Sequence, residues 1–414
     1  MEIFAASYLV PMGSPPREGG AIAVENGRIV AVGSLAELRS AHGGKVAEFD
    51  GCVIMPGLVN SHAHLELTHF PSWKLRKGID YSPRTYVDWV IQVIKIRRGL
   101  TRDELELSVR EGIRIALESG TTAVGEILTD RILVPCYQGS RLGGRIFFEA
   151  IGQDEGKCSA LLKDLRSSLD GFPPGRFKAG LSPHAPHTLS ARFMGEVTEL
   201  AGSYSLPAMI HLAESREESA FLHDSSGKIA DLLYPFAGWE SHLPPPRRTT
   251  PTAYLDSLGA LQQGTAVVHC VHVTPADVDT LKRRGVTAVL CPRSNHRLVV
   301  GKAPAALLKK AGVPLALGTD SLASNDSLSL WDEMRFLHRE FPSLFTPTEI
   351  LEMVTTGGAR ALRMENELGS LAPGKRADFL VVRPGEVNSP EDLAEALLEA
   401  GELREVYIGG EQLH

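Results

Sequence analysis

Two histidines, His62 and His64, stand one residue apart in the segment GLVNSHAHLE. In an extended strand alternate side chains point to the same side, so both imidazoles would face one site. Two imidazoles on one rigid strand suit a divalent metal ion. The pair is not specific by itself, because the chain has 14 histidines and chance pairs are expected.

Similar side chains recur at the ends of other apolar segments of strand length. These are His184 and His187 in SPHAPH, His211 in IHLAES, His269 and His272 in VVHCVH, and Asp320 in GTDS. Ionisable groups at the carboxyl ends of so many predicted strands indicate one convergent site. Together, His62, His64, His211 and Asp320 would form a site for one Zn²⁺, or alternatively Fe²⁺, with one coordination position left for water.

The strands that would position these groups alternate with helical patterns from Pro56 onward. The eight strand segments are GLVNSHAHLE, TTAVGEIL, RIFFEAIG, FKAGLSPHA, PAMIHLAES, TAVVHCVHV, TAVLCPRSN and PLALGTDS. Eight such repeats predict an α/β protein with a closed (β/α)8 TIM barrel. The alternative is a long doubly wound sheet, for which about six strands would be typical.

A small β-sandwich domain is expected beside the barrel. Short alternating strands fill residues 21–53 and turn at Asn26-Gly27, a pair typical of tight hairpins. Near the other end, GSLAPGKRADFLVV and LREVYIGGEQLH return to β character. We therefore expect residues 1–55 and 365–414 to form one composite β domain, with the barrel in residues 56–364.

Two excursions rich in aromatic residues, proline and arginine interrupt the barrel repeat. They are FPSWKLRKGIDYSPRTYVDWVIQVIKIRRG after the first strand and LYPFAGWESHLPPPRRTTP after the fifth. Both follow the carboxyl ends of strands, so they should overhang the site as lids or specificity loops. For the second excursion, a plain surface loop is an equal alternative.

Composition limits the class of protein and its partners. With 43% hydrophobic and 22% charged residues, the chain is typical of a globular protein with a large core. A formal charge of -7 leaves no basic surplus for a nucleic acid polymer. No apolar run is long enough for a membrane span, and the five cysteines lack a disulfide or zinc-knuckle spacing. A cytoplasmic protein without a membrane partner is expected.

Taken together, the motifs resemble the amidohydrolase superfamily in order and along nearly the whole chain. The segments that carry the resemblance are PGLVNSHAHLEL, HLAES, HCVH, CPRSN, GTDSLASN and PGKRADFLVV. The nearest branch contains deaminases of nucleobases and nucleosides. Within it, HAHLEL, YVDWV and GTDSLASNDSLSLWDEMR are similar to the aminodeoxyfutalosine deaminases of menaquinone biosynthesis.

The resemblance assigns roles to the residues of the site. It implies that His62, His64, His211 and Asp320 hold the metal, which lowers the pKa of bound water to about 7. Asp320 would accept a proton from this water. Glu214, in the pattern H-x-x-E, would protonate a ring nitrogen, which requires a pKa raised by burial. His269 would contact the attacking hydroxide, whereas His272 is expected to be structural.

A missing lysine separates this chain from two-metal relatives such as the hydantoinases. Those proteins use a carboxylated lysine at the end of the fourth barrel strand, where this chain carries His184. The nearest lysine, Lys178, stands at the start of that strand and therefore at the wrong end of the barrel. One metal and deamination of an aromatic ring are favoured over hydrolysis of a cyclic amide.

Candidates for substrate contact lie near these motifs, and His184 would contact the sugar or base of a nucleoside. Further candidates are Glu66, Arg76 and Arg84 for a sugar or carboxylate, Trp73, Tyr81, Tyr86 and Trp89 for a ring, and Ser321 beside Asp320. The leading hypothesis is hydrolysis of 6-amino-6-deoxyfutalosine to futalosine and ammonia. The alternatives are S-adenosylhomocysteine, methylthioadenosine or guanine deaminase, triazine chlorohydrolase, and an inactive barrel scaffold. A homodimer is expected by analogy with the branch.

Overall fold

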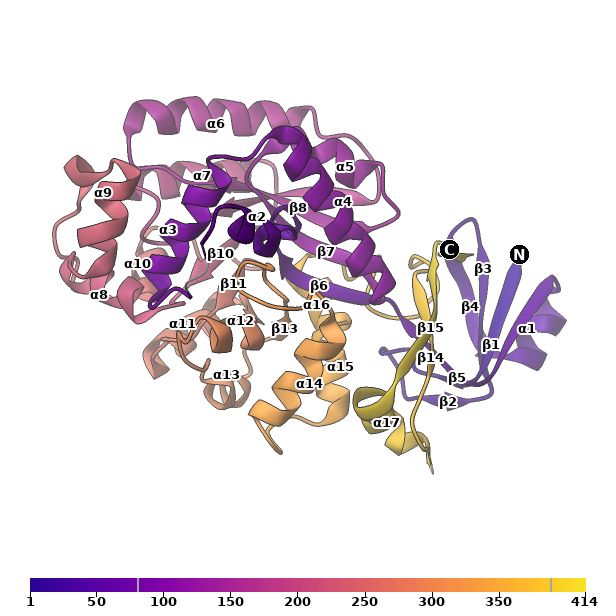
Figure 1. The fold of residues 1–414 in the computed structure, drawn as a ribbon. Coiled ribbons are helices and arrows are strands. Elements are labelled where there is room, and N and C mark those ends of the chain that lie inside the picture. Colours follow the sequence, from indigo (N-terminus) through magenta and orange to yellow (C-terminus); the bar gives the residue numbers. More distant parts are fainter. Residues whose placement is uncertain (80–81, 388) are drawn as a thin grey trace.

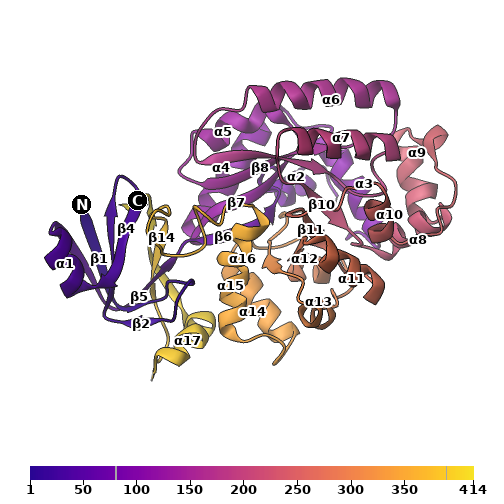
Figure 2. The same cartoon turned by 180° about the vertical axis from the view of Figure 1, so that it is seen from behind.

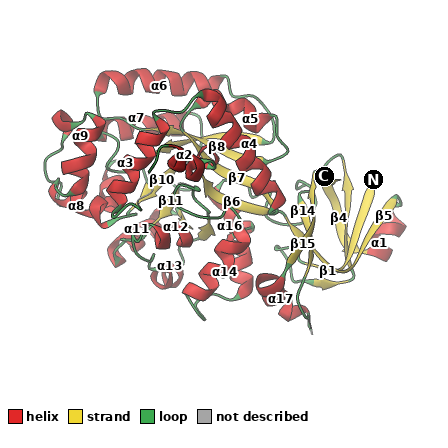
Figure 3. Ribbon diagram, in the orientation of Figure 1, coloured by secondary structure: helices red, strands yellow, loops and turns green. Residues whose placement is uncertain are grey.

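The computed structural model describes residues 1–79, 82–387 and 389–414, and it confirms the predicted α/β barrel. Eight parallel strands of these residues form two four-stranded sheets, β6-β7-β8-β9 and β10-β11-β12-β13. Isolated parallel bridges join the two sheets, Leu181 with Ala208 and Ala63 with Asp320. Figure 3 shows these strands enclosed by helices. The strands are β6 (Leu58–Ala63), β7 (Thr121–Leu128), β8 (Gly143–Ala150), β9 (Phe177–Pro183), β10 (Met209–Leu212), β11 (Ala266–His269), β12 (Thr287–Leu290) and β13 (Leu315–Leu317).

Barrel strands are apolar on both faces because helices cover the outside and side chains fill the inside. Every residue of β7 and β8 is buried. The surrounding helices are α4 (Arg102–Glu118), α5 (Val134–Gln138), α6 (Glu155–Asp170), α7 (Ala191–Ser203), α8 (Arg216–Asp224), α10 (Pro251–Ser257), α11 (Pro275–Arg284), α12 (Pro292–Arg297), α13 (Ala305–Ala311), α14 (Leu330–Glu340), α15 (Pro347–Met353) and α16 (Thr356–Ala361). Helix α4 begins at a capping box, in which Thr101 and Glu104 bond each other's backbone N–H groups.

A second sheet, beside the barrel, brings the two ends of the chain together (Figures 1 and 2). Hydrogen bonds run through it continuously in the order β16-β15-β14-β5-β1-β3-β4, so the expected sandwich takes the form of one continuous sheet. Its elements are β1 (Glu2–Leu9), β2 (Arg17–Glu18), β3 (Gly20–Glu25), β4 (Arg28–Ser34), β5 (Lys45–Pro56), β14 (Phe379–Arg383), β15 (Glu402–Ile408) and β16 (Glu411–Gln412), with helices α1 (Leu35–His42) and α17 (Leu393–Ala400). The predicted turn joins β3 to β4, where Asn26 and Gly27 have φ angles of 52° and 75°.

The two excursions fold into short helices. The first forms α2 (Phe70–Arg76) and α3 (Tyr86–Arg97), and the second forms α9 (Tyr234–Ala237). Short helical turns occupy Leu65–Leu67, Arg131–Leu133, Ile229–Leu233, Glu240–His242 and Pro390–Asp392. Among the described residues, every helix falls short of the length and apolar character that a membrane crossing requires.

Candidate metal and catalytic site

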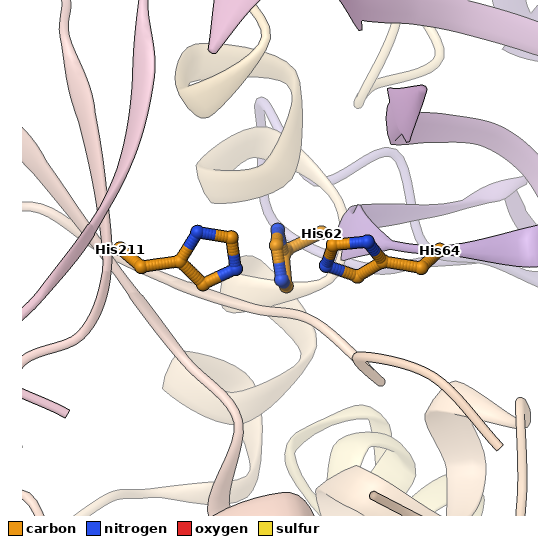
Figure 4. A group of neighbouring side chains, drawn as sticks. All are labelled: His62, His64 and His211. Atoms are coloured by element: carbon orange, nitrogen blue, oxygen red, sulfur yellow. The ribbon is translucent and has the colours of Figure 1, made fainter. Parts of the chain in front are cut away.

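Three imidazoles meet at the carboxyl ends of two barrel strands. His62 lies on β6 and His64 directly after it, while His211 comes from β10 in the other half of the barrel. One ligand nitrogen from each lies within 4.8 Å of the others, and Figure 4 shows the rings pointing toward one another. In the described part of the chain, this is the cluster of His, Cys, Asp and Glu side chains whose spacing suits a metal ion.

Asp320 lies beside this cluster. Its Oδ1 atom is 3.7 Å from Nε2 of His62 and 3.7 Å from Nε2 of His64. The residue follows β13 and has a φ of 57°, a left-handed conformation that is uncommon for a residue with a side chain. Its backbone N–H donates to the carbonyl of His62 at 3.0 Å, which fixes the carboxylate against the first strand.

The side chains present fit a divalent metal. His62 Nε2 is buried and has no hydrogen-bond partner among the described residues. Burial lowers the pKa of His62 and of His211, and it lowers the pKa of His64 to about 4, so the imidazoles are neutral as metal ligands must be. Nδ1 of His211 lies 3.0 Å from the carbonyl of His184, and donation through this nitrogen leaves Nε2 free to bind a metal.

Glu214 and His269 face each other at the same mouth of the barrel. Glu214 Oε1 lies 3.7 Å from His269 Nε2, and both residues are buried. Burial raises the pKa of Glu214, which favours its protonated form. Nδ1 of His269 lies 2.9 Å from Asn295 Oδ1, an arrangement in which Nδ1 donates and Nε2 faces Glu214 as a lone pair.

The segment that carries Glu214 is held by a second glutamate. Glu218 accepts hydrogen bonds from the backbone N–H groups of Ala213 and Glu214, each at 3.0 Å. Ala213 has a φ of 51° and His269 a φ of 72°. Such strained conformations cluster at functional sites, where the surrounding contacts maintain them.

His64 and His211 of the cluster line one pocket together with Asp320 and Glu214. His184, Glu66, Tyr86, Trp89 and Ser321 line it. Other candidates lie elsewhere. Arg84 is exposed and lines a neighbouring crevice, Arg76 pairs with Glu104, Trp73 belongs to the core, and His272 bonds the carbonyl of Val300. Tyr81 lies outside the described residues.

Sequence reasoning missed several residues of this pocket. They are the polar residues Arg97, Thr129 and Glu149 and the apolar residues Val90, Val93, Ile94, Leu233 and Trp239. Glu149 could have been found by the rule used for the histidines, because it lies near the carboxyl end of β8. The second excursion reaches the pocket through Leu233, Ala237 and Trp239, which favours the lid interpretation for that part.

Lys178 lies near the start of β9 and does not line the pocket. Its ammonium group pairs with Glu367. The position at the carboxyl end of the same strand is taken by His184, as expected.

Metal ligands gathered at the carboxyl ends of barrel strands define a class of barrel hydrolases that activate water with a divalent metal. The chain belongs to the amidohydrolase family, whose model matches residues 53–413, and it is therefore a hydrolase. Residues 20–44 match a model of the bacterial imidazolonepropionase-like composite domain.

Individual relatives resemble the chain along most of its length. A 5-methylthioadenosine/S-adenosylhomocysteine deaminase of Nitratidesulfovibrio vulgaris (strain DP4) is 31% identical over 420 residues, covering 96% of this chain and 87% of the relative. An aminodeoxyfutalosine deaminase of Deinococcus radiodurans is 31% identical over 362 residues, covering 85% and 83%. The zinc-bound structure of an adenosine deaminase from Xanthomonas campestris matches with a TM-score of 0.78 and 27% identity, covering 99% and 92%.

Proposed function

We propose that this protein is a metal-dependent deaminase of adenine-type nucleosides, with 6-amino-6-deoxyfutalosine as its substrate and futalosine and ammonia as its products. The observation that carries the proposal is the position of buried Glu214 opposite His269, at the edge of the cluster formed by His62, His64 and His211. This arrangement puts an acid beside a water-activating site, as hydrolytic deamination requires.

Each side chain has a part in this reaction. The three histidines and Asp320 would hold a divalent metal, which would lower the pKa of bound water and so make hydroxide available at neutral pH. Glu214, whose pKa is raised by burial, donates a proton to the ring nitrogen next to the carbon under attack. His269 Nε2 orients the attacking oxygen, and Asp320 Oδ1 accepts its proton. The bond between the ring carbon and the exocyclic amine then breaks, and the amine takes up the proton held by Asp320 and leaves as ammonia.

The walls of the pocket suit an adenine nucleoside with a further ring. Trp89 and Trp239 line the pocket, together with aliphatic side chains of α3. Aromatic side chains bury large apolar area and stack on flat rings. The relative from Deinococcus radiodurans is named for the same substrate. A second candidate, deamination of methylthioadenosine or S-adenosylhomocysteine, is favoured by the relative from Nitratidesulfovibrio vulgaris.

The test is ammonia release by zinc-loaded or iron-loaded protein. The panel contains aminodeoxyfutalosine, adenosine, methylthioadenosine, S-adenosylhomocysteine and guanine. We expect aminodeoxyfutalosine to have the highest kcat/KM, and Glu214→Gln to lower kcat by at least about 100-fold while the protein keeps its metal. The matched control is Glu217→Gln, an acid of the same charged run that does not line the pocket. Absence of turnover for the whole panel, with one metal bound, would overturn the purine assignment.

A further inference from the structure

A wall of hydrogen-bond acceptors borders the metal-ligand cluster. Glu66 lies just after β6, Thr129 just after β7 and Glu149 on β8, so three neighbouring strands supply the wall. The Thr129 hydroxyl oxygen is 2.9 Å from Glu66 Oε1 and 2.7 Å from Glu149 Oε2. Glu66 and Glu149 are 1% and 7% exposed, and both line the catalytic pocket.

This wall has fewer donors than acceptors. A threonine hydroxyl carries one hydrogen, so Thr129 can donate to Glu66 or to Glu149 but not to both. Glu149 Oε1 lies 3.8 Å from His184 Nε2, which is too long for a hydrogen bond. Among the described residues, the hydrogen bond that Glu149 accepts from Thr129 ends on Oε2 and none ends on Oε1. A buried carboxylate with an oxygen that accepts no hydrogen bond from the protein requires donors from a ligand or from water.

Arg97 is the cation of this wall, and it is already paired. Its Nη2 atom lies 3.2 Å from Glu66 Oε1 and 3.3 Å from Glu66 Oε2. A second carboxylate from the substrate would meet Glu66 and Glu149 at close range, and like charges repel in a buried site. The wall therefore suits a neutral ligand that offers O–H groups rather than an anion.

We infer that Glu66 and Glu149, bridged by Thr129, bind the vicinal diol of a ribonucleoside and so select ribose over deoxyribose. The two adjacent hydroxyls of ribose donate one hydrogen each, one to Glu66 and the other to Glu149 Oε1. The inference rests on the proposed function for its orientation. With the base beside Glu214 and His269, the sugar lies against this wall, because Glu66 follows His64 by two residues and the His184 ring centroid is 4.7 Å from that of His211.

The experiment compares adenosine, 2′-deoxyadenosine and 3′-deoxyadenosine. Calorimetry measures their Kd for the zinc-loaded Glu214→Gln protein, and turnover is measured with the wild-type protein. Loss of a hydrogen bond to a charged group weakens binding, so each missing hydroxyl should raise Kd by roughly 10- to 100-fold. Glu66→Gln and Glu149→Gln, added separately to the Glu214→Gln protein, should each bring the Kd of a different deoxynucleoside close to that of adenosine. The control is Glu199→Gln, an exposed acid on α7.

The outcomes separate this inference from the proposed function. Equal Kd values for the three nucleosides would overturn it, and so would a ribose preference that neither glutamine variant reduces. Failure of adenosine to bind would also count against it. If ribose is preferred in binding but no adenine nucleoside releases ammonia, the deaminase assignment fails while the diol site stands. The comparison of ligands needs no new variant, so it remains decisive even if the buried glutamine variants fold poorly.

Discussion

The two oxygens of Asp320 have different surroundings. Ser294 and Ser324 each donate a hydroxyl hydrogen bond to Oδ2 at 2.7 Å. Oδ1 makes neither bond and faces the imidazoles of His62 and His64. The two serines therefore hold the carboxylate in one orientation, with Oδ1 directed at the metal site.

Removal of either hydroxyl should weaken metal binding. We predict that Ser294→Ala and Ser324→Ala each lower zinc affinity by about 10- to 100-fold, since partners behind a metal ligand orient it. Competition with a chelator measures this affinity. Ser257→Ala is the control, because that exposed hydroxyl bonds only the Tyr254 carbonyl on the outside of the barrel. Unchanged affinity in both serine variants would show that the orientation of Asp320 does not depend on them.

At the residue scale, sequence predicted the groups that stand at strand ends but missed those that arrive by packing. The sequence predicted four residues of the site because strand periodicity and position at strand ends direct their side chains to the same end of the barrel. They are His62, His64, His211 and Asp320. Arg97 was not, since it comes from a helix of an excursion whose path no periodicity specifies. Arg84 shows the converse, because an arginine near a motif has no spacing rule that directs it inward, and it lies outside the pocket.

At the scale of elements, helix α3 covers the pocket and is tied to the loop after β13. The indole N–H of Trp89 donates to the carbonyl of Ala323 at 2.9 Å, three residues beyond Asp320. Val90, Val93 and Ile94 of the same helix line the pocket. The single hydrogen bond thus joins the cover of the site to the segment that carries a predicted metal ligand.

Loss of the hydrogen bond from Trp89 to Ala323 should affect substrate binding more than it affects the stability of the fold. We predict that Trp89→Phe, which keeps the apolar ring and removes the donor, raises KM and lowers kcat/KM by about 10-fold, the order of one buried hydrogen bond. Amide hydrogen exchange should increase in α3 and stay unchanged in α7, which packs against β9 and α6. Equal exchange in both helices, with kinetics unaltered, would contradict an anchoring role.

Regular elements followed from the sequence better than the excursions did. The eight barrel strands were predicted because runs such as TTAVGEIL are mostly apolar and of strand length, as buried parallel strands are. For the two excursions the sequence gives only a composition rich in aromatic residues and proline. Such a composition does not predict the course of the backbone. The structure shows α3 and α9 there, and the pocket walls formed by these segments depend on long-range packing that local patterns do not encode.

At the scale of the whole molecule, the candidate metal site joins the two halves of the barrel. His62 and His64 belong to the sheet β6-β7-β8-β9, whereas His211 and Asp320 belong to β10-β11-β12-β13 or follow its last strand. Isolated backbone bridges join the two sheets, Leu181 with Ala208 and Ala63 with Asp320. A metal bound by all four side chains would therefore cross-link the halves at the carboxyl end.

Metal removal should destabilise the whole barrel rather than the site alone. A ligand that binds only the folded state adds about 4 kcal/mol at a thousandfold excess over its Kd, so Tm should rise with zinc concentration and fall when a chelator is added. Differential scanning calorimetry at a fixed scan rate measures the shift. His211→Ala should abolish the zinc dependence, because it removes one of the two predicted ligands of the second half and the only imidazole among them. His272→Ala should retain it, because that imidazole bonds the Val300 carbonyl outside the cluster. A Tm that is insensitive to zinc in the wild-type protein would mean that the halves are held by packing alone, with the four side chains contributing nothing to their union.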